Sequence, residues 1–404
     1  MPYPAAFGLA LGIVGSIAAV QTVLGFTLPL LALELSGSGS GLALIKGAGF
    51  VPNILFAIFI GVVNDRILKV RAFRGYVGGL ALATAGLWVA GLTGAISVFG
   101  LAVFVILFNA LAYASGNAQM TLIRLTVDEP RLSDATALTS TVFAVITTAG
   151  PAVAGFALIQ LGHQGVIAGA AVVMGLTFAG TLALKLDETL DPPRPFWPSL
   201  AEGWQVLRAN RELLAMTVVI VLTNAAEGAF ATALILKLDA GGVDAFGIGT
   251  VLACAGVGAV FASRLAAPAR RRFGYRAAFF WPIWGLALLY LAIALDWPFA
   301  VICGLSFLEG ALSLFFAIGV WSYRQESTEA RHMGRVAGLT GAIFKIGMPP
   351  VIILAGILSD AGALLAVFGM AAAINVAAAL YLAVVAGWGW PRSVPGREDR
   401  RPAP

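Results

Sequence analysis

The sequence is short of charge, and this shortage excludes most soluble folds. Only 11% of its 404 residues are Asp, Glu, Lys or Arg, whereas 60% are hydrophobic and the mean hydropathy is +0.93. A soluble domain carries about 25% charged residues. A single aqueous core could not bury so much apolar surface, so the composition predicts an integral membrane protein.

Cysteine and histidine are also scarce, with two of each. Cys254 and Cys303 lie in apolar runs and no CxxC pair occurs, so we expect free thiols. His163 and His332 are isolated, and we expect neither a metal site nor a cofactor. The absence of P-loop, HExxH and GxSxG motifs argues against direct use of ATP and against an enzyme. The net charge of +5 is spread over loops, which predicts no nucleic-acid partner.

Long apolar runs, by contrast, are abundant. A transmembrane helix needs about 20 apolar residues, and the chain offers twelve such runs, near residues 6–33, 42–64, 73–94, 97–124, 134–160, 164–186, 212–238, 243–267, 276–295, 298–322, 335–359 and 362–388. We therefore expect an all-α integral membrane protein with twelve transmembrane helices. Lys and Arg concentrate in alternate loops, which predicts cytoplasmic N- and C-termini.

The longest polar interruption divides the chain into two equal sets of spans. The predicted parts are an N-terminal six-helix half (1–186), a cytoplasmic linker (187–211), a C-terminal six-helix half (212–390) and a cytoplasmic tail (391–404). Within the linker, apolar residues recur at helical spacing at Trp197, Leu200, Trp204 and Leu207. This pattern predicts a short amphipathic helix on the inner membrane surface.

A short basic loop follows the second span of each half, GVVNDRILKVRAFRG at 61–75 and ASRLAAPARRRFGYR at 262–276. Equivalent loops indicate two related halves, as in many transporters. The first loop resembles the signature G-x-x-x-D-R-x-G-R-[RK] of the major facilitator superfamily. The matching residues are Gly61, Asp65, Arg66 and Lys69. Leu68 replaces the usual Gly, and Val70 replaces a basic residue.

This resemblance covers the whole chain and implies the fold of that superfamily, in which the seventh and tenth spans line a central cavity. It also implies that the loop acts as a conformational latch, with Asp65 paired to a basic group near a helix end. Orientation by positive charge alone would explain the basic residues, but not the acidic residue among them.

The fifth span contains TTAGPAVAG (147–155), which is similar to the Gly-Pro motif of exporters in this superfamily at Gly150, Pro151 and Gly155. Proline kinks a helix and glycine permits close packing, so a structural kink explains part of the pattern. The remainder favours export. The segments RLTVDEPRLSDATALTS (124–140) and HMGRVAGLTGAIFKIGMPPVIILAGILSD (332–360) also resemble bacterial twelve-span exporters of drugs, macrolides or siderophores. This resemblance implies a place in the inner (plasma) membrane.

Three charged residues lie inside predicted spans of the second half: Glu227, Glu309 and Lys345. An intramembrane charge indicates a functional site with a nearby partner. Because burial favours the neutral carboxyl group, one proton shared by Glu227 and Glu309 would neutralise the cluster and make it a proton carrier. The alternative is a static Glu309–Lys345 bridge with a permanently protonated Glu227. Glu227 is the better candidate for coupling, because the sequence shows no dedicated partner for it.

Uncharged polar residues line the predicted helix faces around this cluster. We expect the substrate cavity to be lined by Gln21, Thr22, Asn53, Asn109, Tyr113, Asn117, Asn224, Ser306 and Ser313. Glu34 and Lys46 flank the first outer loop, and we expect both at the membrane interface.

Together these features predict a secondary active transporter that moves a small organic molecule by alternating access. The expected substrate is drug-like, siderophore-like or another amphipathic metabolite, and proton-coupled export is favoured. The alternatives are a proton-coupled importer of a siderophore, sugar or other nutrient, and a lipid flippase. The sequence disfavours a membrane scaffold or sensor, because such a protein would typically carry an appended soluble domain and no part of this sequence predicts one. The expected partners are the substrate, protons and the lipid bilayer, with the protein acting as a monomer.

Overall fold

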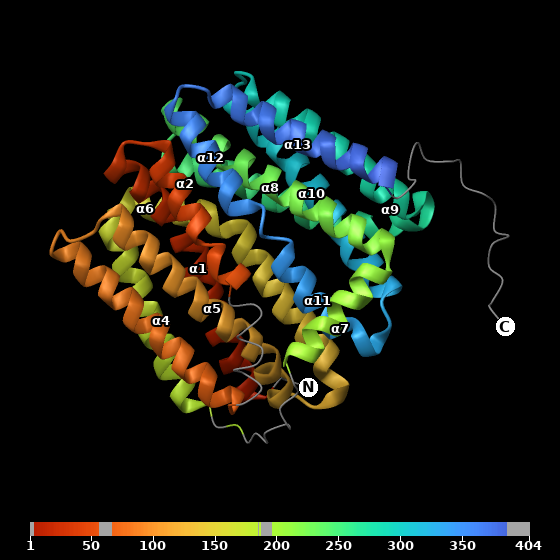
Figure 1. The fold of residues 1–404 in the computed structure, drawn as a ribbon. Helices are drawn as coiled ribbons and strands as arrows, with labels where there is room; N and C mark the ends of the chain where they lie inside the picture. Colours follow the sequence, from red (N-terminus) through yellow and green to blue (C-terminus); the bar gives the residue numbers. More distant parts are fainter. Residues whose placement is uncertain (1–3, 56–66, 185, 187–195, 386–404) are drawn as a thin grey trace.

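The computed structural model describes residues 4–55, 67–184, 186 and 196–385, and every regular element in this part of the chain is helical (Figure 1). The first part of the bundle contains α1 (Ala5–Ser36), α2 (Gly39–Ala48), α4 (Lys69–Leu92), α5 (Val98–Thr126), the 3-10 turn η1 (Glu129–Arg131) and α6 (Leu132–Ala183). The second part contains α7 (Phe196–Ala209), α8 (Arg211–Ala240), α9 (Ala245–Ala294), α10 (Phe299–Ser327), α11 (Ala330–Ile343), α12 (Met348–Asp360) and α13 (Leu364–Val385). The predicted all-α class is confirmed.

The described residues include nine helices long and apolar enough to cross a membrane, or up to ten if one bent pair counts as a span. Two of the long helices are interrupted by glycines with left-handed backbone, Gly162 in α6 (φ 65°) and Gly274 in α9 (φ 75°). Glycine adopts this conformation readily because it has no Cβ. The multi-pass class is confirmed, while the count of twelve, the orientation of the termini and the boundaries of the halves stay predictions.

The two halves share a hydrophobic core near one end of the bundle. Phe26 and Ala154 from the first half belong to the same buried cluster as Phe230 and Tyr290 from the second half. The rings of Phe230 and Tyr290 stack with centroids 4.0 Å apart. We call this end, where α2 begins and α12 finishes, the α2 end, and the opposite end the α7 end (Figure 1). The halves are therefore held together by packing, not by covalent continuity alone.

The seam at the α2 end consists of α2 against α12 and of α6 against α9 (Figure 1). Glycines let the backbones approach closely, as small residues do in membrane helix interfaces. A Cβ on Gly155 would overlap the carbonyl oxygen of Ala245, and one on Gly249 would overlap that of Pro151. In the other pair, a Cβ on Gly356 would lie 2.8 Å from the carbonyl oxygen of Gly39. The predicted Gly-Pro stretch is therefore part of the contact between the halves.

Asp360, at the end of α12, binds the first backbone amides of α2. The amide of Gly39 donates to its Oδ1 at 2.5 Å and the amide of Ser40 donates to its Oδ2 at 3.0 Å. A carboxylate at a helix N-terminus satisfies orphan N–H groups and interacts favourably with the helix dipole. This contact joins the two halves at the rim of the seam.

The span formed by α11 and α12 is broken at residues 344–347. Pro349 and Pro350 have no backbone N–H, so the carbonyls of Lys345 and Ile346 lose their regular helical donors. The amide of Met348 turns back to the Lys345 oxygen at 3.1 Å, and the side chain of Asn224 donates to the Phe344 oxygen at 2.9 Å. The break therefore exposes Lys345 on an irregular segment that α8 supports.

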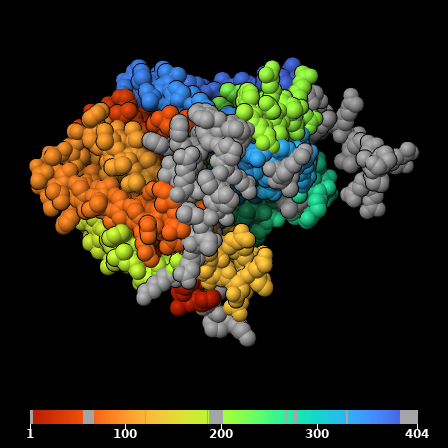
Figure 2. Space-filling view, turned by 60° about the horizontal axis from the view of Figure 1, so that its bottom comes forward, coloured from red at the N-terminus to blue at the C-terminus, as the bar shows by residue number. Residues whose placement is uncertain are grey.

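The predicted linker helix is present as α7, and it packs on α11 at the α7 end of the bundle (Figure 2, light green beside light blue). Leu207 is buried against Leu213 and Val336, whereas Trp204 is 46% exposed. Glu202 of α7 pairs with His332 of α11 at 2.8 Å and also with Arg335. One face of α7 thus docks on the second half and the other remains accessible.

Candidate substrate and proton site

Three cavities share lining residues: two of about 310 and 430 Å³ are lined by both halves, and a third of about 260 Å³ is lined by the first half alone. We call them the amide cavity, the charged cavity and the side cavity. Asn53 lines all three, and Lys345 lines the first two. Pockets of this combined size accommodate small organic ligands.

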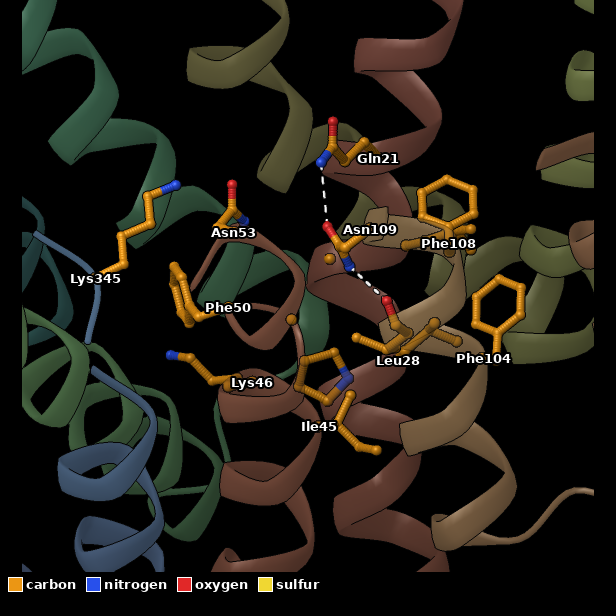
Figure 3. A pocket seen from close by; sticks show the side chains of 15 residues that line it. Gln21, Leu28, Ile45, Lys46, Phe50, Asn53, Phe104, Phe108, Asn109 and Lys345 are labelled. Atoms are coloured by element: carbon orange, nitrogen blue, oxygen red, sulfur yellow. Dashed lines mark hydrogen bonds between the residues drawn. The ribbon is translucent and has the colours of Figure 1, made fainter. Parts of the chain in front are cut away.

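The first half supplies a wall of side-chain amides to the amide and side cavities (Figure 3). Gln21 donates to the Asn109 side-chain oxygen at 3.2 Å, and Asn109 donates to the Val105 carbonyl at 2.9 Å. Tyr113 and Asn117 continue this row on α5. These residues follow the helical spacing seen in the sequence, and their polar ends face a cavity.

Glu227 of α8 lines the charged cavity and interacts electrostatically with Lys46 of α2. Lys46 comes from the first half and lines the amide cavity, whereas the sequence placed it at the membrane interface (Figure 3). Its location follows from the packing of α2 on α12 and α8. The carboxyl group that had no partner in the sequence thus has one in the opposite half.

Glu309 lies behind the wall of the charged cavity and is only 7% exposed. It interacts electrostatically with Glu227 and with Tyr290, a residue that also lines the charged cavity. Among the described residues, Glu309 has no ion pair with Lys345. The two carboxyls thus interact electrostatically, the alternative Glu309–Lys345 bridge is not formed among the described residues, and proton sharing between Glu227 and Glu309 stays a prediction.

Lys345 reaches into the space between the cavities from the break in α11 and α12 (Figure 3). Its Nζ lies 5.9 Å from the ring centroid of Phe50 in the first half. Arg324 of α10 lines the charged cavity, with its Cζ 6.0 Å from the ring centroid of Phe344. Aromatic faces attract such cations without neutralising them.

The remaining predicted cavity residues divide into two groups. Asn224 and Ser313 line the charged cavity. Thr22 and Ser306 line none of the three cavities described above: Thr22 packs against Gly150 of α6, and Ser306 is 1% exposed. Helical spacing predicts which residues share one face of a helix, but it does not predict whether that face meets a cavity or another helix.

Three residues of the signature loop, Gly61, Asp65 and Arg66, lie outside the described residues. Lys69 begins α4. In the same helix Arg74 donates from Nε to the Thr181 carbonyl at 2.9 Å and from Nη2 to the Leu184 carbonyl, at the C-terminus of α6. A cation at a helix C-terminus satisfies its last carbonyls. One basic residue of this region therefore joins two helices of the first half. The latch itself stays a prediction.

The predicted fifth-span motif packs against two neighbouring helices. Gly155 and Pro151 contact α9 of the second half, while Gly150 contacts α1 of its own half. The helix continues through Pro151, and its non-helical residue is Gly162. The motif therefore contributes close helix packing on both sides of α6.

Sequence reasoning missed Lys46 and Arg324 as cavity residues. Lys46 begins the second predicted span, and Arg324 ends the tenth, so each was assigned to a loop or an interface. The sequence did offer a signal, because each lies a few helical turns from a polar residue expected in the cavity: Lys46 is about two turns from Asn53, and Arg324 is about three turns from Ser313.

The fold and the site together indicate a class of membrane protein. Helices of two halves enclose a polar, charged cavity at membrane depth, which is the arrangement of a membrane transporter with its site at the interface of two repeats. A family model described as Major Facilitator Superfamily matches residues 9–241, more than half of the chain. The protein belongs to the Major Facilitator Superfamily.

Solved structures agree in fold. The nucleoside transporter NupG superposes with a TM-score of 0.72 at 13% identity, covering 94% of this chain and 99% of its own. The POT family transporter PepTSo gives 0.74 at 12%, covering 94% and 98%. A bacterial homologue of the iron transporter ferroportin, in an inward-facing state, gives 0.73 at 13%, covering 95% and 98%. No curated protein matches the sequence. At such identities the likeness concerns the fold alone.

Proposed function

We propose that this protein is a proton-coupled secondary transporter of a small organic molecule, working by alternating access with Glu227 as the proton carrier. The observation that carries the proposal is the interaction of Glu227 in the second half with Lys46 in the first, beside cavities that both halves line. A proton on Glu227 removes this attraction between the halves. Protonation therefore changes the relative stability of states in which the halves are close or apart.

The proposal includes twelve membrane crossings, cytoplasmic termini and a place in the inner membrane, with the protein acting as a monomer. The glycine breaks in α6 and α9 support two crossings in each of these long helices. The basic residues of alternate loops support the orientation.

The proposed direction is export of a drug-like, siderophore-like or other amphipathic metabolite, and it is supported by the Gly-Pro stretch at the seam. A second candidate is import of the substrate together with a proton. Arg324 and Lys345 on the wall of the charged cavity support this candidate. A negatively charged substrate held by them would favour the protonated form of the nearby Glu227, so substrate and proton would bind together.

The test is proton exchange by the purified protein in detergent. Cationic dyes, macrolides and siderophores are added in weak buffer with a pH indicator to the wild type, to Glu227→Gln and to the control Glu34→Gln, whose carboxyl is 70% exposed. We expect a substrate-driven proton signal in the wild type and the control, and none in Glu227→Gln.

The sign of the signal separates the two candidates. Release of protons on binding indicates exchange of substrate for proton, and uptake indicates that both travel together. An equal signal in the wild type and Glu227→Gln would remove Glu227 from the mechanism and direct attention to Glu309.

A further inference from the structure

We propose that the substrate is an organic anion whose carboxylate or phosphate group binds between Lys345 and Arg324. The inference rests on the proposed function, since it names the substrate class for the same cavity. It concerns binding, however, and can be tested without any transport or proton signal.

The charged side chains on the walls of the three cavities are mainly basic. They comprise Lys46, Arg324 and Lys345 against the single carboxyl of Glu227. Because Lys46 and Glu227 act on each other, the surplus positive charge belongs to Lys345 and Arg324. Protonation of Glu227 would make the wall more positive still.

Neither surplus cation has a carboxylate partner among the described residues. Lys345 faces the ring of Phe50, and Arg324 faces the ring of Phe344 and donates from Nη1 to the Thr340 hydroxyl at 3.0 Å. The Nε of Arg324 is buried without a hydrogen-bond partner in the described part of the chain. An unpaired buried donor on a charged group is costly, so this arrangement indicates a missing acceptor.

An oxyanion supplies that acceptor. The planar guanidinium offers parallel N–H donors that match a carboxylate or phosphate, and the ammonium of Lys345 adds a point charge. Both side chains line the charged cavity, so one ligand bound there can contact both. The site is thus prepared for one anionic group held by two cations.

The other residues that line the cavities indicate the chemistry of the rest of the ligand. Phe316 and Trp321 line the charged cavity, and Phe50 lines the adjoining amide cavity beside Asn53 and Gln21. Apolar rings with a few amides suit an aromatic or otherwise amphipathic body. The substrate is therefore an amphipathic anion, and a purely inorganic ion would leave most of the cavity unfilled.

The position of Glu227 gives the anion a definite effect on proton binding. A negative group bound near a carboxyl favours the protonated form of that carboxyl, and by linkage the proton favours the anion. Binding should take up protons, and substrate and proton should travel together. This outcome would select the second candidate of the previous section.

The first experiment measures the electrostatic preference of the cavity directly. Ser313, which lines the charged cavity, is changed to Cys in a full-length chain carrying Cys254→Ala and Cys303→Ala. The labelling rates are compared for two methanethiosulfonate reagents of similar size, the anionic ethylsulfonate and the cationic ethyltrimethylammonium. Each rate is divided by the rate with a free thiol.

We expect the anionic reagent to be favoured by about tenfold or more, as clefts of one charge concentrate ligands of the other. Lys345→Gln and Arg324→Gln should each reduce the preference, and the double variant should abolish it. The exposed Arg264→Gln is the matched control and should leave it unchanged. An equal rate for both reagents, or a faster cationic reagent, would overturn the inference even if proton exchange is observed.

The second arm identifies the anionic group by protection of the same cysteine from labelling. The probes share one ring system: 1-naphthoate, 1-naphthyl phosphate, the neutral 1-naphthamide and the cation 1-naphthylmethylammonium. Stronger protection by 1-naphthoate or by 1-naphthyl phosphate supports an anion site and tells which group it prefers. Protection confined to the neutral or cationic probe would contradict the inference.

Discussion

The two halves line neighbouring cavities with different chemistry. The first half presents amides and a phenol from α1 and α5, at Gln21, Asn109, Tyr113 and Asn117. The second half presents Glu227, Arg324 and Lys345 from α8, α10 and the break before α12. Lys46 is the exception, a charge that the first half contributes.

This difference indicates that the first half mainly offers neutral hydrogen-bonding groups, whereas the second half offers most of the charged groups. Amides donate and accept in many geometries, so the neutral wall can keep its contacts when the halves move. Charges at membrane depth depend on a partner, and the partner of Glu227 comes from across the seam. In the proposed mechanism, proton coupling therefore depends on the interface between the halves.

The largest expected effect comes from breaking the pair that bridges the halves. Glu227 and Lys46 are both half-buried and interact electrostatically without forming a direct ion pair, so removing one charge leaves the other in a poorly solvated site without its partner. Glu227→Gln should therefore destabilise the protein strongly, and Lys46→Met less, since Glu227 can take up a proton. The double variant should recover more than half of the loss, as measured by unfolding midpoints in detergent.

The control for this cycle is Glu34→Gln combined with Lys46→Met, two sites that no described interaction joins. Their effects should add. Additive losses for Lys46→Met and Glu227→Gln themselves would show that the two residues do not interact, because coupled sites deviate from additivity.

A second effect concerns the seam at the α2 end. Gly155→Leu or Gly249→Leu cannot fit against the facing carbonyl oxygens, so we expect each variant to disfavour the closed seam and reduce transport in proteoliposomes by about tenfold or more. Gly169→Leu, in the same helix as Gly155 but with open space around it, is the matched control.

Crosslinking across the seam provides the structural readout for these variants. A cysteine pair at Gly47 of α2 and Ile353 of α12, where a Cβ on Gly47 would lie 3.6 Å from the Ile353 side chain without overlap, should crosslink readily in Gly169→Leu and poorly in Gly155→Leu. Undiminished crosslinking together with lost transport would place the effect of Gly155 somewhere other than the seam.

A smaller effect is expected at the rim of the seam. Asp360→Ala removes the acceptor for the first two amides of α2, and loss of such a cap costs about 1 kcal/mol. Asp360→Asn keeps one acceptor oxygen and should lose about half as much. Hydrogen exchange at Gly39 and Ser40 measures the local opening, and equal exchange in all three proteins would mean that the contact does not form in solution.

The smallest effect is expected for the exposed pair at the end of α1. His163 and Glu34 lie 2.9 Å apart, but the Glu34 side chain is 70% exposed. Exposed pairs contribute about 0–1 kcal/mol, so Glu34→Gln should shift the unfolding midpoint by no more than a degree or two. A shift comparable with that of Glu227→Gln would contradict the contrast between buried and surface charges.

Much of the architecture could be predicted from the sequence because the membrane imposes it. Apolar runs of about 20 residues must become helices, since each backbone polar group needs a partner inside lipid. The linker helix followed from the spacing of Trp204 and Leu207 with their neighbours. Pro349 and Pro350 indicate the break in the eleventh span, although the apolar run at 335–359 predicts one continuous helix.

The site was predicted in part. Spacing along a helix identified Asn109, Tyr113, Asn224 and Ser313, which all line a cavity. It also included Ser306, which faces packed neighbours, because periodicity gives a direction and no distance. The partner of Glu227 was missed, since 181 residues of chain separate it from Lys46 and no local pattern connects them.

The sequence by itself determined the membrane class, the helices and the superfamily, because composition, apolar length and a loop signature act locally along the chain. Only the tertiary structure decided which charges interact: Lys46 with Glu227, Glu227 with Glu309, and Lys345 with the ring of Phe50 in place of a carboxylate. The physical reason is that electrostatic interactions depend on distance and burial in space, and close packing of α2, α8 and α12 sets both.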